Sequence, residues 1–170
     1  MATVTERTVR TGSLSADTYE KCLAVAAIAL LLTVLTALFR GRAQWGAVPA
    51  PVWAHLATIL PALALTPVML LRPRGDALHR LLGKIWVAAM FLTALISFDV
   101  RLSQHGGLSF IHILSAYVIV AAPLIWWTAR NHQVTRHRGQ VRGMVTGALL
   151  IAGFFTLPFG RLLGRWLFGA

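Results

Sequence analysis

The sequence of 170 residues contains a single cysteine, Cys22. One thiol cannot form an internal disulfide, and it cannot supply a thiolate cluster for a metal. Cys22 lies at the start of a long apolar run, where we expect it to be a small buried residue. Stability therefore has to come from packing and not from covalent cross-links.

Acidic residues are also scarce, with 5 Asp and Glu against 16 Lys and Arg. The sequence has no G-x-S-x-G motif, no H-E-x-x-H motif and no phosphate-binding glycine loop. Among the acids near candidate histidines, Asp76 and Asp99 fall at opposite ends of one predicted helix, so they cannot form a carboxylate pair. Hydrolytic chemistry therefore has little support.

Charge of either sign is low, at 12% of residues, where soluble domains have about 25%. Hydrophobic residues make up 57% of the chain, and several apolar runs approach the roughly 20 residues that cross a bilayer as a helix. These features predict an all-α fold, a polytopic integral membrane bundle. Its immediate partner is then the lipid bilayer.

The net charge of +11 does not indicate a nucleic-acid partner. The cations lie in short segments between the apolar runs, as topology-setting residues do. No segment is similar to a nucleic-acid recognition module. We therefore expect no nucleic acid among the partners.

The apolar runs predict a polar N-terminal tail over residues 1–18 and a single membrane domain over 19–170. The first run exceeds the length of a signal-peptide core and is followed by arginines, which favours a retained helix. Prolines at 49 and 51 suit the entry of the second helix, and Asp76 is a good N-cap for the third. The five predicted transmembrane helices are residues 22–39, 52–71, 77–100, 110–128 and 141–159.

The distribution of Lys and Arg predicts that the N-terminus lies inside and the C-terminus outside. With this orientation, eleven of the basic residues fall in inner segments and five in outer ones. Inner segments of membrane proteins are enriched in Lys and Arg.

Four histidines then sort into two layers. His55 and His112 fall near the outer ends of the second and fourth helices. His79 and His137 fall at the inner ends of the third and fifth.

Two imidazoles from facing helices at one depth are the ligands that a b-type haem needs. Gly83, one turn after His79, would let a flat ring approach the helix closely. The face of this helix that includes Trp86 and Met90 is predicted to point into the bundle, and the face that includes Leu81 and Leu92 to point into lipid.

Structural roles explain the same residues, and the sequence leaves both readings open. Interfacial histidines often bond headgroups or helix ends. The row Gly139, Gly143 and Gly147 suits packing of another helix as well as a flat ring. Likewise Arg136, Arg138 and Arg142 could hold haem propionates or anionic lipid, although inner-side topology alone explains them.

The motif His79-Arg80-x-x-Gly83, the histidine of the following helix and the Arg136-His137-Arg138 entry to the last helix resemble a bacterial membrane family called domain of unknown function 2306. The resemblance covers residues 52–160 and implies a multi-pass protein of the bacterial inner membrane, with no established activity.

The histidine pattern is more weakly similar to di-haem cytochrome b561 bundles. That likeness implies that His55 and His112 bind one haem b, and His79 and His137 another. The inner histidines lie very close to the interface, which leaves the inner haem less well supported than the outer.

Three functions follow from these patterns. The first is electron transfer from a quinol or a cytosolic donor to an outer acceptor through bis-His haem. The second is a non-catalytic accessory subunit of a larger membrane complex. The third, less favoured, is transport of protons or a small solute, for which Pro61 and Pro67 would break one helix and Asp99 would carry protons.

Overall fold

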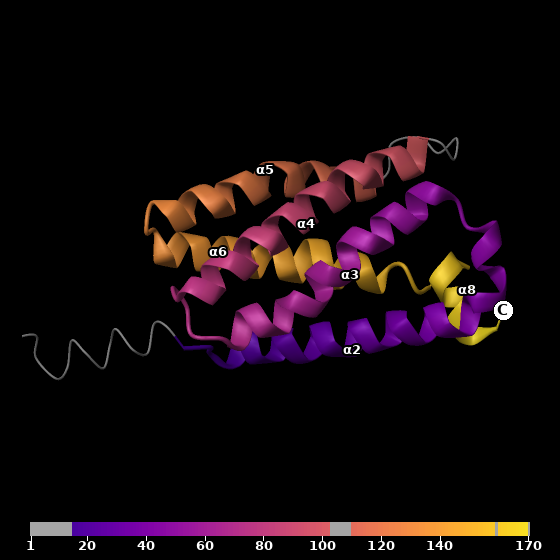
Figure 1. Ribbon diagram of the computed structural model, residues 1–170, viewed down its shortest axis with the longest axis horizontal. Coiled ribbons are helices and arrows are strands. Elements are labelled where there is room, and N and C mark those ends of the chain that lie inside the picture. Colours follow the sequence, from indigo (N-terminus) through magenta and orange to yellow (C-terminus); the bar gives the residue numbers. More distant parts are fainter. Residues whose placement is uncertain (1–14, 103–109, 159, 170) are drawn as a thin grey trace, which may run out of the picture.

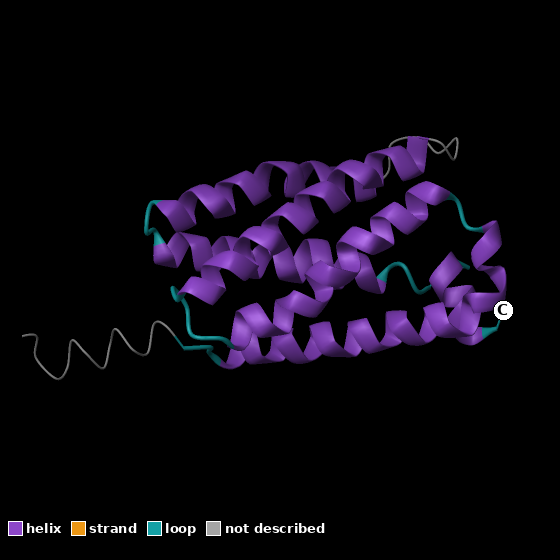
Figure 2. Ribbon diagram, viewed as in Figure 1, coloured by secondary structure: helices purple, strands orange, loops and turns teal. Residues whose placement is uncertain are grey.

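The structure is a computed structural model that describes residues 15–102, 110–158 and 160–169. These residues form helices and short connections, with no strand (Figure 2). The elements are α2 (Thr18–Arg40), the 3-10 helix η1 (Gly41–Ala47), α3 (Ala50–Leu71), α4 (Ala77–Leu102), α5 (Phe110–Arg130), α6 (Val134–Met144), the π-helix η2 (Val145–Ile151), α7 (Ala152–Phe154) and α8 (Leu162–Phe168).

Local sequence explains where three helices begin. At the start of α2, Asp17 and Glu20 form a capping box, in which each side chain accepts the other residue's backbone N–H. The start of α3 has Pro49 as its N-cap and Pro51 in the first turn, where a proline removes no hydrogen bond. Asp76 precedes α4 and accepts the backbone N–H of His79 at 2.6 Å, as an N-cap should.

Within the described residues, four helices are long and apolar enough to cross a membrane: Thr18–Ala47, Ala50–Leu71, Ala77–Phe98 and His112–Arg130. Each of α2 to α6 packs against the next along the chain, and η2 and α8 also contact α2. Figure 1 shows the start of α2, the α3–α4 connection and the start of α6 at one end of the bundle. The opposite end holds η1 and α8. We call the first end the α2-start end.

The last long helical segment differs from its predicted span. It begins at Val134, seven residues before the expected position, and ends at Phe154. Its first part, α6, carries arginines and is polar, while the apolar part is wound as the π-helix η2. Arginine is a good helix former, so the helix extends into residues that hydropathy alone assigns to a loop.

The two faces of α4 are sorted as the sequence predicts. Trp86 and Met90 are buried in the core, whereas Leu81 and Leu92 are exposed on the outside of the bundle. The prediction for Cys22 is wrong, because its side chain is exposed. Cys22 lies on the side of α2 that faces away from the other helices, which position in an apolar run does not reveal.

The far end of α2 packs against α8 through Gly41 and Trp166. A Cβ atom at Gly41 would lie 2.0 Å from the Trp166 ring, so only glycine allows this contact. The Trp166 indole N–H also donates to Gln44 at 2.8 Å. The C-terminal segment is therefore anchored at the end of the bundle opposite the start of α2.

Candidate functional site

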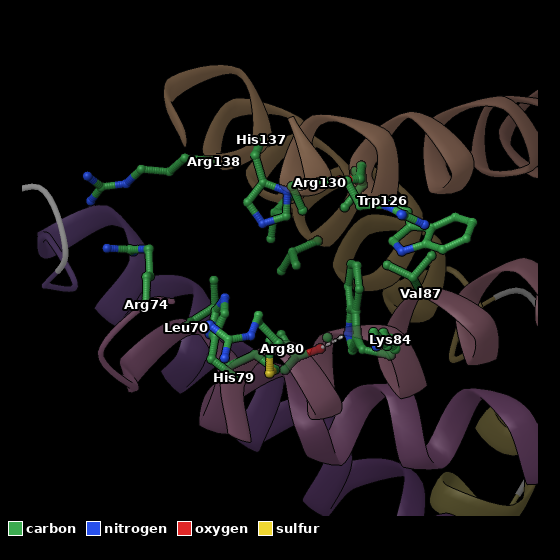
Figure 3. Close-up of a pocket in the computed structure, with 18 of the residues that line it drawn as sticks. Leu70, Arg74, His79, Arg80, Lys84, Val87, Trp126, Arg130, His137 and Arg138 are labelled. Atoms are coloured by element: carbon green, nitrogen blue, oxygen red, sulfur yellow. Dashed lines mark hydrogen bonds between the residues drawn. The ribbon is translucent and has the colours of Figure 1, made fainter. Parts of the chain in front are cut away.

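A cavity of about 250 Å³ lies at the α2-start end of the bundle, where Glu20 and Arg74 are among the residues that line it. His79 from α4 and His137 from α6 both line it. Figure 3 shows the two imidazoles on opposite sides of the cavity. The structure thus brings the predicted inner pair of histidines to one space, although their helices are separated by α5 in the sequence.

The tautomer of His137 is fixed by a backbone carbonyl. Its Nδ1 lies 3.1 Å from the carbonyl oxygen of Ile125 on α5. A carbonyl can only accept a hydrogen bond, so Nδ1 carries the proton and Nε2 keeps its lone pair. Histidines that bind metals commonly donate their other ring N–H in this way.

His79 is half-buried, and its Nδ1 is enclosed with no hydrogen-bond partner among the residues that the structure describes. Buried polar atoms in proteins nearly always have a partner, so an unpaired one calls for an explanation. The capped first turn of α4 fixes the backbone of His79 at the cavity edge. A ligand that forms a hydrogen bond or a coordination bond with this nitrogen would give it a partner.

Gly83 lines the cavity one turn after His79. An added Cβ would meet only the end of the Met69 side chain, at an ordinary 3.4 Å. Helix packing therefore does not require glycine here. The missing side chain instead enlarges the cavity beside the histidine.

Apart from Glu20, the buried residues that line the cavity are apolar or form a hydrogen-bonded pair. Trp86 donates its indole N–H to the hydroxyl of Thr66 at 2.9 Å, so this polar group is satisfied. Leu70, Ile125 and Val145 provide apolar walls. Such walls suit the apolar part of a bulky ligand.

A buried ion cluster adjoins one side of the cavity. The Glu20 side chain is 1% exposed and accepts hydrogen bonds from Arg74, from Arg138 at 2.7 and 2.9 Å, and from Arg142 at 3.2 Å. Asp17 also pairs with Arg138 and Arg142. The backbone N–H of Glu20 and these arginines hold the pKa of Asp17 below its usual value.

This cluster was not expected from sequence. Arg138 and Arg142 are two of the residues that we considered as propionate ligands, and both bind carboxylates of the chain itself. The third, Arg136, is exposed and does not line the cavity. The sequence gives no sign of this pairing, because Glu20 is 118 and 122 residues away from its α6 partners.

The outer histidines have different surroundings, and neither lines the inner cavity. His55 is half-buried on α3, with its Nδ1 3.1 Å from the hydroxyl of Ser97 on α4. His112 is buried on α5 and packs on Phe98, with ring centroids 5.5 Å apart. The Ser97 contact gives His55 a hydrogen-bonded role between two helices.

The glycine row on the last segment is packed at one position only. At Gly143 a Cβ would lie 3.3 Å from the Tyr117 hydroxyl, whereas Gly139 and Gly147 have nothing within 4 Å. The side chains of Asp99 and Arg101, and all of His105, lie outside the described residues.

His132 also lines the cavity and has a positive φ of 56°. The positive φ marks a tight connection between α5 and α6, which brings the start of α6 back beside the cavity.

In comparisons with known proteins, no family model matches this chain, and no match is found among curated proteins or solved structures. Within the described residues, no group of three or more His, Cys, Asp or Glu side chains is arranged to hold a metal ion.

Proposed function

We propose that this chain is a membrane electron-transfer protein of the b-type cytochrome kind. In this proposal His79 and His137 would hold a haem b in the inner cavity. The observation that carries the proposal is that imidazoles from two helices line the same cavity, on opposite sides of it (Figure 3). The outer pair, His55 and His112, remains a proposed second site with weaker structural support.

The residues around the cavity fit a haem in three respects. The His137 Nδ1–H is bound by the Ile125 carbonyl, which leaves Nε2 available to a metal. The buried Nδ1 of His79 has no partner among the described residues. Gly83 adds free space on the His79 side, where a flat ring would need it.

Bound haem would supply one-electron chemistry at its iron. The chain would supply two neutral imidazoles, a fixed tautomer at His137 and an apolar wall. Burial in apolar surroundings and the identity of the axial ligands are the main protein features that set a haem potential.

The membrane arrangement that we propose has five spans, with the N-terminus inside and the C-terminus outside, in a bacterial inner membrane. Its support is the excess of Lys and Arg at the α2-start end and the position of α8 at the opposite end (Figure 1). The fifth span would be the apolar part of the last segment, from Val141 onward.

An absorption spectrum tests the function. The full-length protein from haem-replete cells should show a Soret band and, after dithionite, an α-band near 560 nm, a rough value for bis-His haem. H79A and H137A should each lose most of the inner-site signal. The control H132N changes a histidine at the same cavity to a residue that tolerates positive φ, and it should keep the spectrum.

Absence of haem bands in the wild-type protein would refute the function. Bands that persist in both H79A and H137A but vanish in H55A or H112A would move the haem to the outer pair.

One observation favours a second candidate, the accessory subunit. Gly139 and Gly147 leave open space on the surface of the last segment, where a helix of another protein could approach. If the chain purifies at near-native expression with no partner, this alternative loses its support.

A further inference from the structure

Three cations at the cavity have no acidic partner among the side chains that the structure describes. The acids in that set, Asp17, Glu20 and Asp76, are all in ion pairs with other arginines. Those pairs leave out three basic residues that line the cavity and have no carboxylate within 4 Å among the described residues: Arg80, Lys84 and Arg130.

These three residues come from α4 and α5, two of the helices that line the cavity. Arg80 and Lys84 are one turn apart on α4, and Arg130 ends α5. Figure 3 shows Lys84 and Trp126 on one side of the cavity and Arg74 and Arg138 on the other. We call Arg80, Lys84 and Arg130 the cation rim.

Local contacts keep the cation rim near the cavity without neutralising it. Arg80 donates to the carbonyl oxygen of Gly75 at 2.6 Å. The Arg130 guanidinium lies 5.5 Å from the centre of the Trp126 ring, a cation–π contact that retains the charge. All three side chains are exposed, so their remaining N–H donors are available to a ligand.

The cavity is therefore amphipathic. Leu70, Ile125 and Val145 form an apolar part of its wall, and among the described residues that line it the one carboxylate, Glu20, already accepts hydrogen bonds from three arginines. A ligand that fits this pattern has a bulky apolar body and one or more carboxylates at one edge. Arginine and lysine form their strongest hydrogen bonds with such carboxylates.

We infer that the cation rim binds the propionate carboxylates of the ligand that His79 and His137 coordinate, an inference that rests on the proposed function. The propionate edge then faces the gap between α4 and α5, and the Glu20 cluster takes no part in binding it. This assignment replaces Arg136, Arg138 and Arg142, the residues that the sequence suggested.

The test compares haemin with haemin dimethyl ester, which has the same ring and iron but no carboxylates. Full-length protein from haem-starved cells is placed in nanodiscs of zwitterionic lipid and titrated with each compound, with the Soret band as readout. The variant is R80Q/K84Q/R130Q, and each single substitution is measured as well. The control K21Q/R136Q removes two exposed cations that do not line the cavity.

Wild-type protein should bind haemin at least tenfold more tightly than the ester, the loss expected for one charge-assisted hydrogen bond. The triple variant should bind both compounds equally, with unchanged band positions that report intact histidine ligation. The control should keep the preference.

Equal wild-type affinity for the two compounds, with histidine-dependent bands, would overturn the inference and leave the proposed function standing. If the control K21Q/R136Q also loses the preference for haemin, the effect comes from general surface charge, and this result would likewise overturn the inference. If neither compound gives bands that depend on His79 and His137, both the function and the inference fail.

Discussion

Replacing Glu20 by Gln should destabilise the protein more than any comparable change of an acid. The substitution keeps the shape of the side chain and removes its charge. It leaves Arg74, Arg138 and Arg142 close together, with only Asp17 to pair with two of them. Breaking one partner of a buried ion pair typically costs about 3–5 kcal/mol, because the remaining charge stays buried.

The cost here should lie below that range. The partner side chains are 11%, 20% and 27% exposed, so water reaches each of the three arginines. We therefore expect a loss of about 2–3 kcal/mol, near that of one or two charged hydrogen bonds. For a chain of this size such a loss lowers Tm by about 5–10 °C.

Thermal unfolding in detergent, followed by circular dichroism, measures this effect. The double variant E20Q/R142Q removes one of the cations that Glu20 balances, so it should recover part of the lost stability. Wild-type stability in E20Q, or a double variant that is less stable than E20Q, would contradict the electrostatic reasoning.

Two further predictions concern other parts of the fold. G164A should detach α8 at a cost of about 1–3 kcal/mol, because its Cβ would lie 1.7 Å from the Leu157 carbonyl oxygen. Faster amide hydrogen exchange over residues 162–168 would show this detachment. The control G46A adds a Cβ where nothing lies within 4 Å, so its exchange should match that of the wild type. D76N keeps an N-cap but loses its charge. Arg72 and the backbone N–H of His79, which the carboxylate accepts, hold the pKa of Asp76 in the folded protein below its usual value. The charge of Asp76 therefore stabilises the fold at every pH above the ordinary aspartate pKa. This stabilisation is lost as the pH falls through the lowered pKa of the folded protein. Melting curves should show D76N less stable at pH 7 and equal to wild type in strong acid, and a pH-independent difference would contradict this.

Helices were the part of the fold that sequence could predict, because they depend on local patterns. Long apolar runs, the Asp76 cap and the prolines before α3 act within a few residues of where they occur. The alternation of faces on α4 also follows from helical periodicity, which is why Trp86 is buried and Leu81 exposed.

The site required information that periodicity does not contain. The sequence predicts the depth of each histidine along the membrane, which is why His79 was grouped with His137. The depth of two residues does not predict whether their helices leave a cavity between them. Residue types also cannot predict that the Ile125 carbonyl binds His137, because every residue has a backbone carbonyl. Hydropathy favoured the outer pair, because it lies deeper in the predicted spans, but it cannot predict the contact between His55 and Ser97.

The Glu20 cluster has a consequence for the order in which the chain folds. Glu20 belongs to the first helix, but Arg138 comes 118 residues later. At about 5–20 residues per second, the ribosome adds that partner on the order of ten seconds after Glu20. Among the three arginines of the cluster, only Arg74, 54 residues after Glu20, is made before α6 and can pair with it early. The position of Glu20 in the first turn of α2 also leaves its carboxylate open to water until α6 emerges, which a position at the bilayer centre would not. Closure of the α2-start end is thus a late event in biogenesis, completed only when the last long segment returns to the first.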